Sequence, residues 1–161
     1  MTFVRSLTLQ QLGTGAGFAI WGFRAIAIGH SDCPALLRGY ERMFGEDYPP
    51  ALGALHLLAR SIGCRGGRRV SLAAPGCCGV TADELSLIAM LSAAQKHNPD
   101  RRDAHLRWLT GGRIETAAQS AADAIGEIFW KADVSIKAPS VELWSSEQQT
   151  PHRYHHAPGN A

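Results

Sequence analysis

The sequence lacks a strong excess of charge of either sign. It has 16 lysines and arginines against 14 aspartates and glutamates, which gives a net charge of +2 over 161 residues. A DNA-binding domain is usually more basic than this, so we do not expect nucleic acid as the partner. The length fits one domain, and a hydrophobic content of 45% is enough for a sizeable core.

The sequence also lacks a secretory signal and a long uninterrupted hydrophobic run. The N-terminus has no compact basic region followed by an apolar run and a small-residue cleavage site. The most hydrophobic stretch, residues 12–28, is broken by glycines and contains Arg24. A membrane span needs about 20 apolar residues, and an arginine at its centre is costly. We therefore expect a cytoplasmic chain in which this stretch is a buried helix.

Local signals for sheets and repeats are missing, and helical periodicity dominates. Residues 69–73 alternate weakly, but a lone strand has no partner here, so we predict no sheet. Apolar residues at helical spacing, separated by glycine and proline, predict helices over residues 16–28, 34–44, 52–62, 82–97, 99–110 and 113–131. The expected fold class is all-α, a compact bundle of five or six helices with short loops.

The bundle is expected to span residues 16–132. Residues 1–15 show no clear cap and predict a flexible leader. From residue 133 the helical periodicity fades and the chain becomes polar, which predicts a mostly disordered C-terminal tail over residues 133–161. The histidines of that tail, which offer at most a weak metal site, are His152, His155 and His156.

The chain is organised around residues 74–85, where two adjacent cysteines between glycines precede a strong helix start. Thr81 and Glu84 have the spacing of a capping box, and Val80 and Leu85 have that of a hydrophobic staple. Asp83 joins Glu84 in the first turn, where negative charge suits the helix dipole. Capping therefore accounts for both carboxylates, and we assign them no catalytic role.

The first candidate for chemistry is a zinc site. His30 and Cys33 lie in one turn, and Cys77 and Cys78 lie in a second loop. Zinc favours four nitrogen and sulfur ligands from two short segments, but adjacent cysteines suit a metal less well than C-x-x-C, and no established spacing is met. The favoured interpretation is that each cysteine is a small buried hydrophobe. No cofactor is otherwise expected.

A second candidate is thiol redox chemistry at Cys33, Cys77 and Cys78. A cysteine near a helix N-terminus and near arginines can have a lowered pKa. Against this, Asp83 and Glu84 offset the positive field, and a Cys77–Cys78 disulfide closes a small strained ring. Reduced thiols are also the default in the cytoplasm.

A third candidate is a basic loop. Arg65, Arg68 and Arg69 lie among glycines just before the cysteine pair, and arginine suits planar carboxylate and phosphate groups. These residues are candidate anion or nucleic-acid contacts, although a solvated surface is the more usual meaning of such a run. His56, on an otherwise apolar helix, is expected to be a core histidine.

Several short motifs between residues 18 and 109 resemble a small bacterial family of unknown function. They are Trp21-Gly22-Phe23-Arg24, Asp32-Cys33, Arg68-Arg69, Pro75-Gly76-Cys77 and Thr81-x-x-Glu84. The resemblance implies an intracellular bacterial protein. It implies no activity, substrate or catalytic residue.

Together these observations favour a small helical interaction or regulatory module, without catalytic activity, that contacts a protein partner. The alternative is a metal-binding or thiol-redox-responsive protein that uses Cys33, Cys77 and Cys78. The sequence favours the first because no catalytic motif is present and a helical scaffold dominates.

Overall fold

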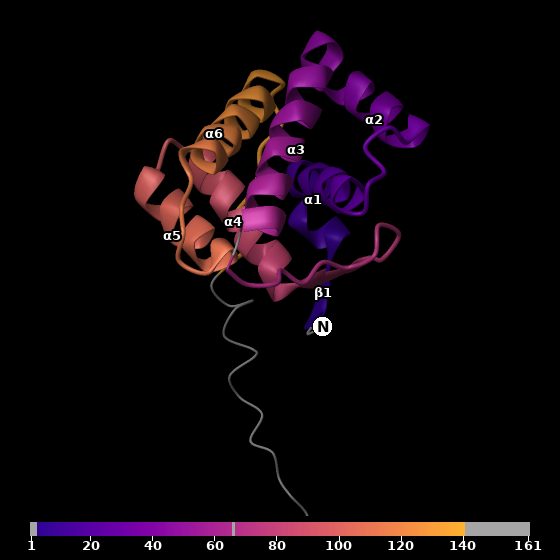
Figure 1. Cartoon of the computed structure of the whole chain (residues 1–161). Coiled ribbons are helices and arrows are strands. Elements are labelled where there is room, and N and C mark those ends of the chain that lie inside the picture. The colour runs from indigo at the N-terminus through magenta and orange to yellow at the C-terminus, as the bar shows by residue number, and fades with distance from the viewer. Residues whose placement is uncertain (1–2, 66, 141–161) are drawn as a thin grey trace, which may run out of the picture.

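The computed structural model describes residues 3–65 and 67–140, and this part of the chain forms an all-α bundle with a small sheet at its edge (Figure 1). The helices are α1 (Thr14–Ala27), α2 (Pro34–Phe44), α3 (Tyr48–Arg65), α4 (Ala82–Gln95), α5 (Pro99–Thr110) and α6 (Thr116–Lys131). Two 3-10 helices are η1 (Leu9–Leu12) and η2 (Gly45–Asp47), and the strands are β1 (Phe3–Thr8) and β2 (Gly79–Thr81). The predicted fold class is confirmed.

Helix α4 lies at the centre of the bundle. Every residue from Asp83 to Gln95 is buried, and the helix packs against α1, α5 and α6. A helix covered on all sides is the structural centre of a small bundle, so α4 has that role.

Helix α6 crosses α4 at very short range. A Cβ atom on Gly126 would lie 2.7 Å from the backbone nitrogen of Gln95, so only glycine fits at this crossing. The alanine-rich face of α6 contributes Ala118, Ala121 and Ala122 to the core. Small residues on α6 therefore allow the two helices to approach closely.

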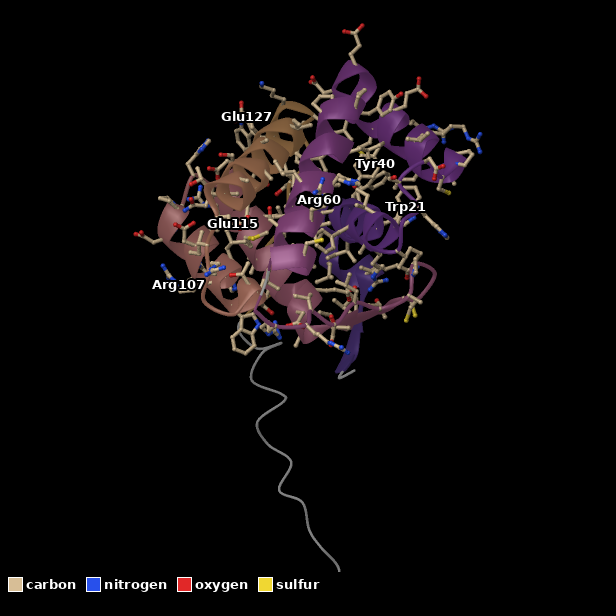
Figure 2. The ribbon with its side chains drawn as sticks, viewed as in Figure 1. Trp21, Tyr40, Arg60, Arg107, Glu115 and Glu127 are labelled. Carbon is tan, nitrogen blue, oxygen red and sulfur yellow. The ribbon has the colours of Figure 1, made fainter. Side chains whose placement is uncertain are left out.

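An aromatic cluster joins α1 to α2. Figure 2 labels two of its members, Trp21 and Tyr40. The centroid of the Tyr40 ring lies 6.2 Å from that of the Trp21 ring and 5.3 Å from that of the Phe44 ring. The Tyr40 hydroxyl donates to the Phe18 carbonyl oxygen at 2.7 Å. Burial raises the pKa of Tyr40 far above its usual value, so this hydroxyl stays protonated and serves packing.

Helix α3 is longer than predicted at both ends. Pro49 and Pro50 lie in its first turn, where a missing amide proton costs no helical hydrogen bond. Gly63 lies inside the helix and does not end it. His56, predicted to be a core residue, is exposed on this helix.

The N-terminal segment is not the flexible leader that the sequence predicted. β1 pairs antiparallel with β2, with Phe3 opposite Thr81 and Thr8 opposite Gly79. Leu7 and Leu12 are buried in the core. The pairing joins segments about seventy residues apart in sequence, so no local pattern indicated it.

The segment after α6 also packs on the bundle as far as the structure describes it. Ile136 is buried, its amide donates to Gln95 Oε1 at 2.8 Å, and Gln95 Nε2 donates to the Val134 carbonyl oxygen at 2.8 Å. The prediction of a disordered tail from residue 133 is therefore wrong for residues 133–140. Residues 141–161, with His152, His155 and His156, lie outside the described residues.

Within residues 3–65 and 67–140, none of the helices combines the length and the apolar character that a bilayer crossing requires.

Candidate functional site

The predicted capping box at the start of α4 is present. Thr81 Oγ1 accepts from the Glu84 amide at 3.1 Å, and the Thr81 amide donates to Glu84 Oε2 at 2.8 Å. Val80 and Leu85 are both fully buried beside it. These contacts begin the helix at the residue that the sequence indicated.

Glu84 has a second role, which capping does not explain. Its Oε1 accepts from Arg24 Nε at 2.6 Å and its Oε2 accepts from Arg24 Nη2 at 2.9 Å. Both side chains are fully buried. The Ala73 amide also donates to Glu84 Oε1, at 3.0 Å. A bidentate pair with additional hydrogen bonds is the arrangement in which buried charges are tolerated.

Arg24 extends this network to the loop that carries the cysteine pair. Its Nη1 donates to the Cys77 carbonyl oxygen at 2.7 Å and to the Ala74 carbonyl oxygen at 3.4 Å, and its Nη2 donates to the Gly79 carbonyl oxygen at 2.7 Å. The loop is thus wrapped around a buried guanidinium. The signal for this was available in the sequence, because an arginine in a buried helix requires a carboxylate partner.

The four cysteines are free thiols with different exposures. Cys33 and Cys77 are half-buried, and Cys64 and Cys78 are exposed. The interpretation that each cysteine is a buried hydrophobe is therefore wrong for Cys64 and Cys78.

The structure does not gather the four residues of the predicted zinc site, which are His30, Cys33, Cys77 and Cys78. His30 is exposed and shares a turn with Cys33, whose amide donates to the His30 carbonyl oxygen at 3.3 Å. Across the described residues, no three side chains of histidine, cysteine, aspartate or glutamate gather in a way that suits a metal ion. The zinc site stays a prediction.

In the predicted basic loop, Arg68 forms an ion pair and Arg69 is exposed to solvent. Arg68 donates from Nη1 and Nη2 to Asp83 Oδ1, at 2.9 and 2.7 Å, while the Ser71 amide donates to Asp83 Oδ2 at 2.7 Å. Arg69 is exposed and forms no ion pair with any carboxylate of the described residues. The side chain of Arg65 lies outside the described residues.

Arg68 also stacks on an exposed tryptophan. Its guanidinium carbon lies 4.9 Å from the centroid of the Trp108 ring, and Trp108 is 59% exposed. We call Arg68, Arg69 and Trp108 the Arg-Trp corner. The Gly67 amide, which donates to the Thr110 carbonyl oxygen at 2.7 Å, fixes this corner to the end of α5.

An open groove of about 500 Å³ lies beside this corner, between α1, α3 and the connection from α3 to β2. Figure 1 shows that connection running along the base of the bundle. Its lining, which is mostly apolar with two cations, is Phe23, Ala27, Ala59, Ile62, Gly63, Gly67, Arg68, Arg69, Val70 and Leu72. We call it the α1–α3 groove.

Arg60 does not belong to the groove although it lies on the same helix. It lines a separate hollow with Leu57, Cys64 and Glu115, and Figure 2 shows Arg60 and Glu115 on one face of the bundle. Helix α3 therefore has two distinct open faces, and only the one with Ala59 and Ile62 contributes to the groove.

A serine–histidine pair on α4 and α5 has contacts typical of packing. Ser86 Oγ and His105 Nδ1 are 3.0 Å apart, but Ser86 is only 1% exposed, so its hydroxyl is out of reach of a substrate. Burial, reinforced by the charge of Arg101, lowers the pKa of His105 below its usual value. The pair stabilises the contact between the two helices.

No family model, no curated protein and no solved structure matches this chain. The resemblance of residues 18–109 to a bacterial family therefore stays a prediction.

Proposed function

We propose that the protein is a small interaction module, without catalytic activity, that binds a segment of another protein in the α1–α3 groove. The segment would carry a large apolar side chain next to a carboxylate. The observation that carries this proposal is the joining of an apolar groove to an open cation, Arg69, at one edge.

The apolar part of the groove suits a side chain of the partner. A volume of about 500 Å³ lies in the usual range of about 300–1,000 Å³ for ligand sites. Apolar carbon from α1, α3 and the connecting segment lines it. Burying one large apolar side chain there would contribute about 1.5–3 kcal/mol.

The corner supplies recognition of a carboxylate. Arg68 is held in place by Asp83 and by the Trp108 ring, and Arg69 beside it is open to solvent. Arginine binds carboxylates bidentately, and tryptophan and arginine are the residue types that dominate binding energy in protein interfaces.

The same contacts favour a protein segment over nucleic acid. Asp83 compensates the charge of Arg68, so Arg69 is the one described cation of the groove that lacks an acidic partner. Nucleic-acid sites usually gather many cations and depend strongly on salt. An apolar lining is also of little use to a phosphate backbone.

The test is selection of a random peptide library, displayed on phage, against the full chain. We expect enrichment of peptides in which Asp or Glu adjoins a large apolar residue, and binding with a weak dependence on salt. Ala27→Trp, at an exposed position of the groove, and Arg69→Gln should each weaken binding. The matched controls Ala124→Trp and Arg42→Gln, both at exposed helical positions outside the groove and its corner, should leave binding unchanged.

Two results would overturn the proposal. One is a set of peptides that bind Ala27→Trp and Arg69→Gln as well as the unchanged protein. The other is steeply salt-dependent binding of a random single-stranded oligonucleotide that requires Arg69, which would identify a nucleic-acid site instead.

The second candidate function is a metal-binding or thiol-redox-responsive protein. It is favoured by the exposure of Cys78 and the partial exposure of Cys77 on a loop fixed by Arg24. The test is metal analysis of protein purified without a histidine tag, with thiol titration under native conditions. One metal per chain, lost in Cys77→Ser and Cys78→Ser, would support it, and unreactive thiols without metal would refute it.

The setting proposed for this module is the cytoplasm of a bacterial cell. It is supported by the four free cysteines, since cytoplasmic thiols are kept reduced. Fractionation of cells that express the native chain tests it, and recovery in the membrane or periplasmic fraction would contradict it.

A further inference from the structure

We propose that a small cavity between the end of α4, the start of α5 and the segment after α6 binds a chloride ion. The cavity has a volume of about 30 Å³. Its lining is Ala89, Ser92, Ala93, Lys96, Asn98, Arg101 and Ala138. It lies apart from the α1–α3 groove and does not depend on the function proposed for that groove.

The first observation is a buried hydroxyl without a partner. Within residues 3–65 and 67–140, Ser92 Oγ is the buried side-chain oxygen or nitrogen for which no hydrogen bond exists. Ser92 is 1% exposed and lines the cavity. Leaving such a group unsatisfied costs about 1–3 kcal/mol, so a bound species that accepts its proton would be stabilising.

The second observation is the positive charge of the other polar side chains that line the cavity. Lys96 and Arg101 bring two positive charges, and no carboxylate of the described residues lines the cavity. Asn98 Oδ1 already accepts from the Arg101 amide at 3.1 Å, so the Asn98 side chain has its amide protons left to offer. The side chains around the cavity therefore offer donors.

The backbone also leaves few hydrogen-bond acceptors free beside the cavity. The carbonyl oxygens of Ser92, Ala93 and Ala94 are taken by the amides of Lys96, Asn98 and His97. The cavity also adjoins the N-terminus of α5, a helix of 12 residues, where the helix dipole favours an anion, while the positive charge of Lys96 offsets the opposite dipole at the C-terminus of α4. A site of donors and positive potential suits an anion better than a cation.

The size of the cavity selects the anion. A volume of about 30 Å³ holds one or two particles of the size of water. A monatomic anion such as chloride matches this volume. Since Ala138 closes one side of the cavity, a bound ion would also fix the segment that follows α6 to α4 and α5.

The test is 35Cl NMR line broadening with the full chain in sodium chloride. We expect excess broadening that bromide displaces and that sulfate at equal ionic strength does not. Ser92→Ala and Arg101→Gln should each lower chloride affinity by about tenfold or more, the effect of one hydrogen bond to a charged group. Arg42→Gln, an exposed change on α2, is the matched control.

Ser92→Ala should fold normally, because it removes an unpartnered hydroxyl. Arg101 is exposed, so Arg101→Gln gives an independent answer if Ser92→Ala fails to fold. Equal broadening in the unchanged protein, Ser92→Ala and Arg101→Gln would overturn the proposal. So would a crystal grown in sodium bromide that has ordinary water density and no anomalous peak beside Ser92 Oγ.

Discussion

Two neighbouring carboxylates at the start of α4 each bind an arginine, with opposite consequences. Glu84 and Arg24 are both fully buried, whereas the side chains of Asp83 and Arg68 are 7% and 31% exposed. The chemistry of the two pairs is the same, and burial separates their roles. The inner pair, Arg24 with Glu84, fixes the loop around Cys77. The outer pair, Arg68 with Asp83, positions an arginine at the surface, beside the groove.

The difference also shows how the candidate site is built on the fold. The Ser71 amide reaches Asp83 and the Ala73 amide reaches Glu84. One short segment of the α3–β2 connection is therefore hydrogen-bonded to both pairs. These bonds hold in place Val70 and Leu72, which line the groove. Measurements that separate the two pairs test this account.

The largest effect is expected from Glu84→Gln. It leaves the buried guanidinium of Arg24 without a counter-charge, and the expected loss in the free energy of unfolding is about 3–5 kcal/mol. Urea unfolding followed by circular dichroism measures it.

The control for that prediction is the double variant Arg24→Met, Glu84→Leu. Replacing both charges by apolar groups removes the unpaired charge, so the double variant should be less destabilised than the sum of the two single changes. If the stability losses of the two single variants simply added up in the double variant, Arg24 and Glu84 would not be energetically coupled.

A smaller effect is expected from Thr81→Val, which keeps the shape of the side chain. Thr81 Oγ1 accepts from the Glu84 amide and donates to the Ser71 carbonyl oxygen at 2.7 Å. Losing the cap and this second bond should cost about 1–2 kcal/mol. Differential scanning calorimetry measures it, and an unchanged melting temperature would mean that the cap contributes nothing.

Asp83→Asn should be milder still, at about 1 kcal/mol or less, because Arg68 is partly exposed and solvent screens the pair. Its main effect should be on the surface: a looser Arg68 over Trp108, seen as a change in tryptophan fluorescence at an almost unchanged melting temperature. If Asp83→Asn destabilised the protein as much as Glu84→Gln does, the contrast between the two pairs would fail.

The smallest effect concerns pH and His105, which contacts Ser86 one turn further along α4. Its pKa is lowered in the folded state from 6.5, first by burial and then by the charge of Arg101. Between the two pKa values the unfolded chain binds a proton that the folded chain does not, so stability should fall as pH drops below about 6.5. Chemical unfolding from pH 7 to 5 measures this slope, and His105→Asn should reduce it. Equal slopes would contradict the assignment.

Local signals in the sequence predicted the helix boundaries that depend on local chemistry. Pro34 begins α2, Gly45 follows its end with a φ of 56°, and Asn98 caps α5 through the Arg101 amide. Gly63 misled the prediction for α3, because an exposed glycine costs a helix only about 1 kcal/mol and tertiary packing overrides it.

Contacts between segments that are distant in the chain were not predicted from the sequence. β1 with β2, Arg24 with Glu84, and Gln95 with residues 134–136 each join parts of the chain that no periodicity relates. Of these, the Arg24–Glu84 pair was open to inference, since a charge in a buried helix needs a partner. The α1–α3 groove was not, because it exists only once α1, α3 and the connecting segment are placed together.

The most direct test of the central claim is a 1H–15N NMR titration of the full chain with a peptide from the display selection. We predict saturable shifts of the Gly63, Val70 and Leu72 amides and of the Trp108 indole N–H, all lost in Ala27→Trp and kept in Ala124→Trp. Trp130 on α6, which is 67% exposed, offers the contrasting surface. Shifts centred on Trp130, with the groove amides unmoved, would contradict the account.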